Sequence, residues 1–332
     1  TPFHYFKGIS ILMLPIVIVL LVYTASQGTV IDGANASRWV KIPFIGLSFQ
    51  TSTLAAVVLM VYTANYLSKP DLRTIKFSKS IIQLWLPVLI VVLLIFPSNL
   101  STAALLFAMV LILAFVAHYP LRYLMTICGL GLVFVLLFFL LVKAFPASFP
   151  NRIDTWVSRI ENFSSGTSHD GNYQVARAKT AIVSGKVFGL GAGKSRMKNF
   201  LPQSSSDFIY AIIVEEFGLV GGIGLILLYL LLLFRIVVIA HNTINLFGKL
   251  TVVGLGIPII FQAFINIGVA LQVLPVTGQN LPMISSGGTS AWMTCIAMGI
   301  ILSVSVKRGE NTEVPDGEEM NTNPISILSE SH

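Results

Sequence analysis

The chain has 332 residues, 55% of them hydrophobic and only 11% charged, with a formal net charge of +7 at pH 7 and a mean hydropathy of +0.84. Because the apolar residues fall in long uninterrupted runs, this composition excludes an ordinary soluble domain and indicates a polytopic membrane protein. The two cysteines, Cys128 and Cys295, both lie inside apolar runs. That placement excludes a disulfide framework and a thiolate metal site, and we expect both to be small core residues.

Eight stretches approach the length of about 20 mostly apolar residues that a membrane helix needs. They cover residues 8–25, 49–67, 80–96, 101–117, 124–143, 219–240, 250–272 and 291–306. The sequence therefore predicts an all-α polytopic membrane protein with eight transmembrane helices in one domain, residues 1–308. A long outer loop, residues 144–218, interrupts the spans. The acidic tail, residues 309–332, is expected to be disordered and cytoplasmic.

The distribution of basic residues predicts the orientation of the chain. With an even number of spans, both ends lie on one side of the membrane. Short segments on that side carry Lys7, Lys69, Arg73, Lys76, Lys79, Arg122, Arg235, Lys249, Lys307 and Arg308. The short segments opposite carry only Arg38 and Lys41. The positive-inside rule therefore places both termini in the cytoplasm, and the long outer loop, which holds the other basic residues, is exempt from the rule.

The chain starts at Thr1, with neither an initiator Met nor a signal-like segment, so we expect a fragment.

The segment "LPVTGQNLPMISSGGTS", residues 274–290, separates the last two spans and is rich in Pro, Gly and hydroxyl residues. Irregular backbone at membrane depth persists only where it is buried in protein or lines a polar cavity. We expect a shaped re-entrant or surface loop. A plain connector is the alternative, although the segment is longer than most helix connections.

Two parts of the long outer loop carry a pattern. "YQVARAKTAIVSG", residues 173–185, mixes apolar and basic residues as a helix lying in the membrane interface would. "GLGAGKSRMKNFLP", residues 189–202, is not a nucleotide phosphate loop, because Phe188 stands where that pattern needs glycine. The remaining interpretation is a glycine-rich turn that presents backbone N–H groups and cations to an anion. A solvated basic surface is the alternative.

The acids follow in "FLPQSSSDFIYAIIVEEFG", residues 200–218. Serines at 204–206 are good N-cap residues, so we expect a helix from Asp207 to about Phe217, ended by Gly218. Glu215 would then lie about 12 Å along the axis from Asp207, too far to form a carboxylate pair with it. Glu215 and Glu216 would lie deeper, where ionisable groups usually have partners or functions. For Asp207, the alternative to function is a favourable interaction with the helix dipole.

These residues resemble the SEDS family (shape, elongation, division and sporulation), which comprises peptidoglycan glycosyltransferases of the FtsW, RodA and SpoVE type. "FQAFINIGVALQVLPVTGQNLPMISSGGTS", residues 261–290, resembles the family signature. "GANASRWVKIPFIGLSFQTSTLA", residues 33–55, and the segment 171–221 are similar to two further family regions. The resemblance covers residues 8–306. It implies a ten-helix fold, of which the span 8–25 resembles the third helix, so the first two are expected to be missing.

The resemblance implies that the chain polymerises glycan strands from lipid II at the outer face of the bacterial cytoplasmic membrane. It implies that Asp207, in Ser-Asp-Phe-Ile, is the catalytic residue, and inverting glycosyl transfer does need a base for the acceptor hydroxyl. Growing charge on the diphosphate leaving group would be stabilised by Lys194, Arg196 and Lys198 or by a divalent cation, magnesium or manganese. Lys198 is the cation best matched to the family, in the Ser-x-x-Lys pattern that begins at Ser195. No metal site formed by the protein alone is predicted.

Further site residues are carried over from the matching motifs. Arg38 is a substrate-binding candidate, with an interface anchor as the alternative. In the segment 274–290, Gln279 and Ser285 are candidates for substrate contact. Residues expected to shape this segment as a wall of the substrate cavity are Pro275, Gly278, Pro282, Gly287 and Gly288.

The sequence departs from the family pattern in three motifs. Thr51, Ser52 and Thr53 replace Pro-Ser-Glu, with Ala56 in place of a lysine; residues 98–102, Ser-Asn-Leu-Ser-Thr, replace Pro-Asp-Leu-Gly-Thr; and Ser286 replaces a tyrosine. Two family carboxylates are therefore absent, and roles that depend on them are not transferred.

The leading hypothesis is a lipid II-dependent glycosyltransferase of cell division. The alternatives are a flippase for a lipid-linked precursor, which would also use a basic cavity and broken helices, a rod-shape elongation enzyme and a noncatalytic division scaffold. The resemblance implies a class B penicillin-binding protein as partner, together with other division proteins and the lipid bilayer. Nucleic acid is not an expected partner.

Overall fold

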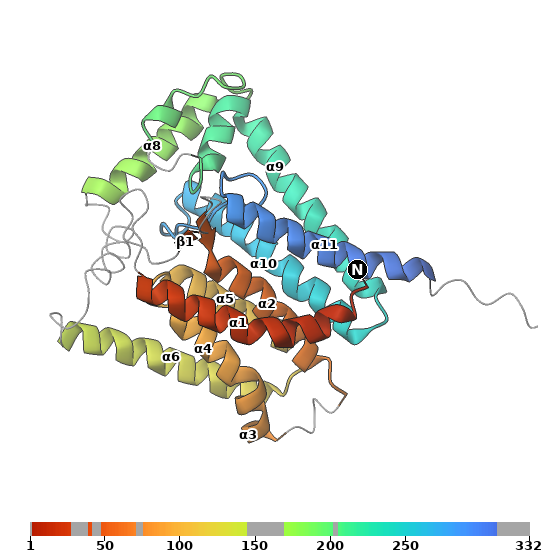
Figure 1. The fold of residues 1–332 in the computed structure, drawn as a ribbon. Helices are drawn as coiled ribbons and strands as arrows, with labels where there is room; N and C mark the ends of the chain where they lie inside the picture. Colours follow the sequence, from red (N-terminus) through yellow and green to blue (C-terminus); the bar gives the residue numbers. More distant parts are fainter. Residues whose placement is uncertain are drawn as a thin grey trace, which may run out of the picture.

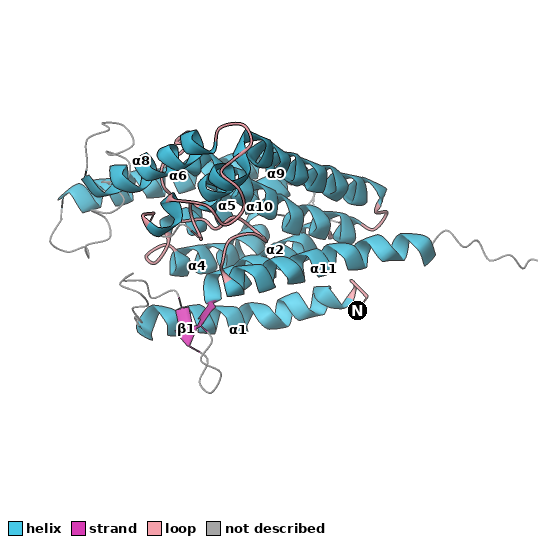
Figure 2. Ribbon diagram, turned by 90° about the horizontal axis from the view of Figure 1, so that it is seen from above, coloured by secondary structure: helices cyan, strands magenta, loops and turns pink. Residues whose placement is uncertain are grey.

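The computed structural model describes residues 2–27, 39–41, 48–70, 76–144, 169–201 and 205–310. Its helices form an elongated bundle in which most axes run side by side (Figures 1 and 2). The elements are α1 (Tyr5–Gln27), β1 (Trp39–Lys41), β2 (Ser48–Gln50), α2 (Thr51–Leu67), α3 (Phe77–Ser80), the π-helix η1 (Ile81–Trp85), α4 (Leu86–Ile95), α5 (Leu100–Val116), α6 (Leu121–Ala144), α8 (His169–Gly185), the 3-10 helix η3 (Met197–Asn199), α9 (Ile209–Asn242), α10 (Leu246–Ala270) and α11 (Gly288–Glu310).

The predicted all-α membrane fold is confirmed, because all eight predicted stretches are helical. Six helices in the described part of the chain are long and apolar enough to span a membrane: Tyr5–Ser26, Phe77–Ile95, Leu121–Phe138, Ile209–Asn242, Leu246–Ala270 and Gly288–Val306. Two apolar helices, Thr51–Leu67 and Leu100–Val116, are shorter, at 17 residues each. The count of eight spans therefore stays a prediction.

Helix α10 lies at the centre of the bundle, where it packs against α2, α5, α9 and α11. Two glycines permit this close packing. A Cβ on Gly254 would lie 3.0 Å from Leu113 Cδ2, and a Cβ on Gly256 would lie 2.5 Å from Ile236 Cγ2. Small residues at helix crossings let backbones approach in this way inside membranes. On the other side of α2, helix α1 contacts α2 and α4, and α6 packs against α5 at the edge.

Helix α9 is two helices joined at a sharp bend. Gly218 has φ 70° and ψ −171°, which breaks the helical path as the sequence predicts. We call the first part, residues 209–217, the stem; the second part runs back along α10 and α11 (Figure 1). The predicted helix over 173–185 is confirmed as α8, which starts at His169 and packs against α9. Its position in the membrane interface stays a prediction. The stem begins at Ile209, and Asp207 lies in the turn before it, contrary to the predicted helix start.

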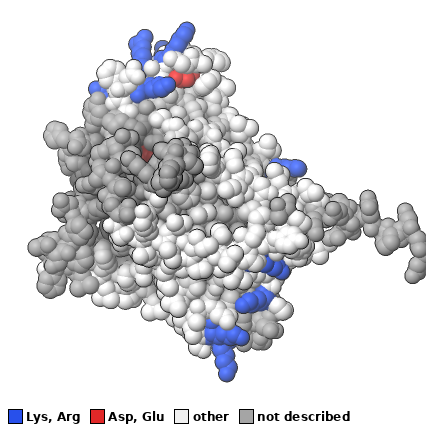
Figure 3. Space-filling view, viewed as in Figure 1, with Lys and Arg blue, Asp and Glu red and all other residues white. Residues whose placement is uncertain are grey.

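The surface is consistent with a membrane protein. Lys and Arg gather over the loop between α8 and α9 and at the end of the bundle near α3, while the surface between is nearly uncharged (Figure 3). Cys295 is exposed on α11 beside exposed Trp292 and Ile296, and Cys128 is only partly buried. The prediction that both cysteines are core residues is therefore wrong, because a membrane helix also turns apolar side chains outward. Residues 311–332, most of the predicted disordered tail, lie outside the described residues.

Candidate functional site

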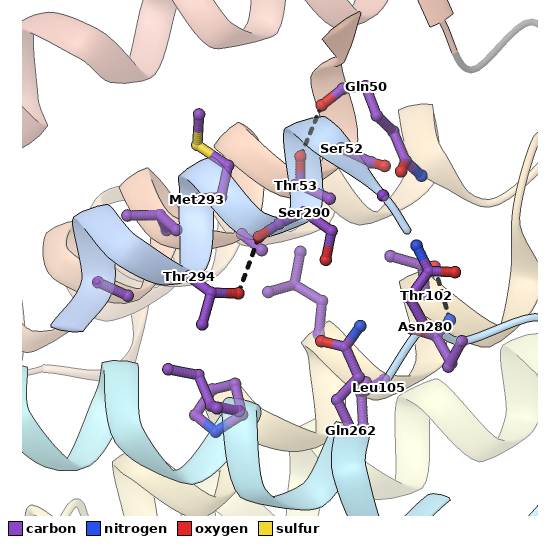
Figure 4. A pocket seen from close by; sticks show the side chains of 18 of the residues that line it. Gln50, Ser52, Thr53, Thr102, Leu105, Gln262, Asn280, Ser290, Met293 and Thr294 are labelled. Carbon is purple, nitrogen blue, oxygen red and sulfur yellow. Dashed lines mark hydrogen bonds between the residues drawn. The ribbon is translucent and has the colours of Figure 1, made fainter. Parts of the chain in front are cut away.

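A cavity of about 650 Å³ lies between α2, α5, α10 and α11, and the segment 271–287, which we call the wall loop, forms part of its side. Polar residues line it where these helices meet the wall loop. Figure 4 shows Gln50 and Thr53 at the start of α2, Thr102 at the start of α5, and Ser290 and Thr294 on α11 around this space. Further along the same helices the lining becomes apolar, with Val57, Met60, Leu105, Met109, Leu255, Ile259 and Ala297. The cavity is therefore amphipathic along its length.

Asp207 is the one ionisable residue among the described residues that line this cavity. Its side chain is mostly buried, with 9% of its surface exposed. A Cβ on Gly278 of the wall loop would lie 3.5 Å from Asp207 Oδ2, and Gly278 has φ 68°. The carboxylate thus lies against a left-handed glycine, a conformation that other residues adopt only at a cost. The predicted catalytic carboxylate therefore lies close to the wall loop.

A single buried amide joins Asp207 to the wall loop. Asn266 Nδ2 on α10 donates to the backbone oxygen of Asp207 at 2.9 Å and to that of Gln279 at 2.7 Å. Asn266 is only 1% exposed, so these bonds are shielded from water. Because unmade hydrogen bonds are costly in a buried site, Asn266 fixes the turn and the loop relative to each other.

The wall loop also holds the serines before Asp207. Ser285 Oγ donates to the backbone oxygen of Ser206 at 2.7 Å, and Ser286 N donates to that of Ser205 at 2.9 Å. The N-cap residue of the stem is therefore Phe208, without a side-chain cap, and not one of the predicted serines; Ser204 lies outside the described residues. Bonds to a distant loop hold this turn outside the helix, which explains the wrong helix start.

The predicted wall residues contribute unequally. Gly278, Gln279 and Gly287 line the cavity, whereas Pro275, Pro282, Ser285 and Gly288 are not among its lining residues. Pro282 instead accepts a hydrogen bond from Tyr229 OH at 2.5 Å through its backbone oxygen.

Gln279 and Ser285, the two predicted substrate contacts of the wall loop, already bond within the protein. Gln279 Nε2 donates to Thr102 Oγ1 at 2.9 Å, which ties the loop to α5. Ser285 Oγ also accepts from Leu281 N at 2.7 Å, so a substrate contact through this hydroxyl would require an internal bond to break.

Several backbone N–H groups of the glycine-rich turn between α8 and α9, which were predicted to bind an external anion, have acceptors within the protein. These amides donate to neighbouring residues of the protein. The amide of Gly189 donates to Gly185 O, that of Gly191 to Glu216 O, and that of Arg196 to Glu215 Oε1 at 3.0 Å. The carboxylate of Glu215 thus occupies the place that the sequence analysis gave to an external anion.

The predicted cations of this turn lie on the surface. Lys194, Arg196 and Lys198 are exposed, and none of the three lines the cavity. Ser195 is turned inward, where its Oγ donates to Glu215 Oε2 at 2.5 Å and accepts from Lys198 N at 3.1 Å. Arg38 lies outside the described residues.

We expect Gly189→Ala to destabilise the protein by about 2–5 kcal/mol, because a left-handed residue gains strain and a buried clash is added. Gly189 has φ 79°, and its Cβ would lie 2.2 Å from the backbone oxygen of Glu216. Gly193→Ala is the matched control, since Gly193 has φ 72° but nothing within 4 Å of a Cβ. Thermal unfolding of the purified protein measures both variants. Equal shifts in the unfolding temperature would contradict the close approach of the backbones at Gly189 and Glu216.

The three motifs that depart from the family pattern converge on the cavity. Ser52 and Thr53 line it from α2, Asn99 and Thr102 from α5, and Ser286 from the wall loop. Asn99 caps α5, since its Oδ1 accepts from Thr102 N at 3.2 Å. The cavity therefore carries neutral hydroxyl and amide groups where the family pattern would place two carboxylates.

Two polar residues of α10 were not predicted as site residues: Asn266, and Gln262, which lines the cavity. A signal was available. The two residues are four apart inside an apolar span, so they lie on one helix face, and polar groups inside membrane helices usually have partners or functions. The short β1–β2 pair, with Trp39 opposite Gln50, was also missed.

Comparison with known proteins gives consistent matches. Residues 1–310 match the family of cell cycle proteins that comprises FtsW, RodA and SpoVE. The probable peptidoglycan glycosyltransferase FtsW of Saccharophagus degradans is 33% identical over 316 residues, which are 91% of this chain and 76% of that protein. The probable peptidoglycan glycosyltransferase FtsW of Hydrogenovibrio crunogenus is 34% identical over 303 residues, 87% of this chain and 72% of that protein.

Solved structures agree with these relatives. A chain from a peptidoglycan synthase complex, studied for its coordination of polymerization and crosslinking, is 27% identical and superposes with a TM-score of 0.68, covering 92% of this chain and 83% of that one. The rod shape determining protein RodA of Thermus thermophilus is 25% identical with a TM-score of 0.62, covering 92% of this chain and 80% of that one. This chain is a multi-pass membrane protein that belongs to the FtsW/RodA/SpoVE family of cell cycle proteins.

Proposed function

We propose that this protein is a peptidoglycan glycosyltransferase that polymerises lipid II into glycan strands at the outer face of the cytoplasmic membrane. The observation that carries the proposal is the amphipathic cavity, with Asp207 as the ionisable group among its described lining residues. Lipid II joins a polar disaccharide to a polyprenyl chain through a diphosphate. Amide and hydroxyl groups suit the sugars, and the apolar walls suit the chain, because ligand sites combine apolar surface with a few placed polar groups. The names of the relatives support the same activity.

Asp207 is the proposed general base. Its carboxylate accepts the proton of the acceptor sugar hydroxyl as that oxygen attacks the anomeric carbon of the donor sugar. The bond from this carbon to the diphosphate oxygen breaks, and the lipid diphosphate leaves with the electron pair. A carboxylate at hydrogen-bond distance is sufficient for such a step, and burial of the group limits competition by water.

The leaving diphosphate needs positive charge, which the described cavity lining does not supply. We propose that Lys194, Arg196 and Lys198 attract the diphosphate from the glycine-rich turn between α8 and α9, residues 189–202, which we call the outer turn. Magnesium or manganese can bind beside Asp207. The donor set fits such an ion, because Mg²⁺ is commonly held by one or two carboxylates together with substrate phosphates. Within the described residues, no group of three His, Cys, Asp or Glu could hold a metal alone. A bound ion would supply charge stabilisation of the diphosphate.

We expect removal of divalent cations to lower the polymerisation rate by about tenfold or more, since loss of charge stabilisation at a leaving group costs several kcal/mol. The measurement compares lipid II polymerisation in reconstituted membranes before and after chelation with EDTA. Magnesium and manganese should each restore the rate. A rate insensitive to EDTA would assign the charge stabilisation to the outer-turn cations alone.

Within the family, we propose the cell-division branch, because the relatives at 33% and 34% identity are FtsW proteins, whereas RodA of Thermus thermophilus is 25% identical. We also propose a class B penicillin-binding protein as the cross-linking partner. The relation to a peptidoglycan synthase complex supports this partner. The proposed orientation has both ends in the cytoplasm, supported by Lys69 just after α2, Arg122 at the start of α6 and Arg235 near the end of α9.

A flippase is the second candidate, because an amphipathic cavity with a broken helix also suits transport of a lipid-linked precursor. Reconstitution with lipid II supplied only on the outer side separates the two functions. The proposed enzyme makes glycan polymer without moving lipid II across the membrane. Translocation of fluorescent lipid II without polymer, in the presence of the cross-linking partner, would favour the flippase instead.

A further inference from the structure

Glu215 is the most deeply buried charged residue among those that the structure describes, with 0% of its surface exposed. It lies in the stem, one residue before the half-buried Glu216 and about 9 Å along the helix axis from the start at Ile209. A carboxylate removed from water persists only where hydrogen bonds or charges compensate. The partners of Glu215 therefore indicate what it is there for.

The Glu215 carboxylate accepts hydrogen bonds from residues of the segment 184–197. Ser195 Oγ donates to Oε2 at 2.5 Å, Arg196 N to Oε1 at 3.0 Å, and Met197 N to Oε1 at 3.3 Å. Ser184 Oγ, at the end of α8, donates to Oε1 at 3.5 Å. Hydrogen bonds to a charged acceptor are the strong ones, so one side chain gathers the turn around itself.

The backbone adds a second set of bonds at the same crossing. Leu190 N donates to the backbone oxygen of Glu215 at 3.0 Å, and Gly191 N to that of Glu216 at 2.9 Å. Beyond the bend, Leu219 N donates to the backbone oxygen of Lys186 at 2.9 Å. The outer turn is thereby fastened to the far end of the stem, while Asn266 fixes the Asp207 turn at the near end.

We propose that Glu215 is a positioning residue for lipid II, an internal anion that holds Lys194, Arg196 and Lys198 in place to attract the substrate diphosphate. The inference rests on the proposed function. These three cations stand on the short segment whose Ser195, Arg196 and Met197 bond directly to Glu215. Without the carboxylate, the segment loses its common acceptor, and the backbone that carries the three cations is no longer held.

Glu215→Gln tests the proposal, because it keeps the size of the side chain and removes the charge and one acceptor oxygen. Two measurements are made on the full-length protein in lipid nanodiscs. Trypsin cleavage after Lys194, Arg196 and Lys198 reports whether the segment is held. The KM for lipid II, measured in polymerisation assays, reports whether the cations still serve binding. We expect faster cleavage and a KM raised about tenfold, with kcat changed less. Loss of the hydrogen bonds to the charged Glu215 would weaken the binding of lipid II equally in the ground state and the transition state.

Two further variants keep the test decisive. Glu216→Gln makes the same chemical change at the neighbouring residue and should leave cleavage and KM as in the parent protein. Ser195→Ala removes one donor and keeps the Glu215 carboxylate, so it should raise the cleavage rate and the KM, each by less than Glu215→Gln does. This variant still tests the proposal if Glu215→Gln does not fold.

Two results would overturn the role. One is unchanged cleavage in Glu215→Gln and Ser195→Ala, and the other is faster cleavage with an unchanged KM. The cleavage measurement needs no enzymatic activity. Failure of the proposed function would instead appear as absence of polymer with every variant and with the parent protein, whatever the cleavage pattern.

Discussion

Asp207→Asn is expected to lower the turnover number for lipid II polymerisation by about 100- to 10,000-fold, the range that a general base contributes. The substitution keeps the shape of the side chain and removes its capacity to accept a proton. Because Asp207 is the ionisable group among the described cavity-lining residues, no neighbouring carboxylate there can substitute for it. The measurement is glycan polymer formation by the protein reconstituted with lipid II on the outer side.

The control for this prediction is Glu216→Gln, the same change of charge at the other end of the stem, where the residue is only half-buried. It should polymerise as the parent protein does. Thermal unfolding of both variants establishes that each is folded. Polymerisation by folded Asp207→Asn within threefold of the parent rate would exclude Asp207 as the base.

Asn266→Asp is expected to lower both stability and turnover, although the two side chains have the same shape. Asn266 Nδ2 donates to two backbone oxygens, those of Asp207 and Gln279. A carboxylate cannot donate there, so both buried oxygens lose their donor, at a cost of about 1–3 kcal/mol each. Displacement of the Asp207 turn by about 1 Å would reduce turnover by about 100-fold. Thermal unfolding and polymerisation rate are measured together.

Thr251→Val is the matched control for Asn266. Thr251 lies on the same helix and is 1% exposed, and its hydroxyl has no hydrogen-bond partner among the described residues. Removing an unpaired buried hydroxyl should leave stability unchanged or slightly raised, with activity unchanged. An Asn266→Asp variant as stable and active as Thr251→Val would show that the amide bridge does not hold the site.

Local sequence signals predicted the helices and the bend. Apolar runs indicated every helix of the bundle, because a backbone inside a bilayer must satisfy its own hydrogen bonds. Gly218 was identified as a helix end because glycine adopts the left-handed region without strain, and its φ is 70°. The helix over 173–185 followed from its mixed apolar and basic pattern. Each of these features depends on residues close together in the chain.

The site depends on contacts between distant residues, and these were not predictable. Asp207 lies in a turn because two distant side chains bind the backbone around it. Asn266 binds the backbone oxygen of Asp207, 59 residues earlier, and Ser285 binds that of Ser206, 79 residues earlier. The glycine-rich turn is already occupied by Glu215, which follows Ser195 by 20 residues. The composition of the turn predicted a site for an anion but could not predict that the carboxylate of Glu215 binds there.

The convergence of the departing motifs has a functional consequence. Ser52, Asn99 and Ser286 come from three separate segments, yet all three line the cavity. Because the other described lining residues are neutral, Asp207 is the residue among them that can act as the base. We therefore expect activity to depend on Asp207 more strongly than the family pattern alone would suggest.

The most direct test is an experimental structure of the full-length Asp207→Asn protein with lipid II bound. If Asp207 is the general base, a sugar hydroxyl of the acceptor lies within about 2.6–3.2 Å of the residue 207 side chain, the distance over which a general base acts. The polyprenyl chain should run along the apolar side of the cavity. A ligand bound elsewhere, with every sugar hydroxyl beyond the reach of a hydrogen bond or one bridging water from residue 207, would contradict this role of Asp207.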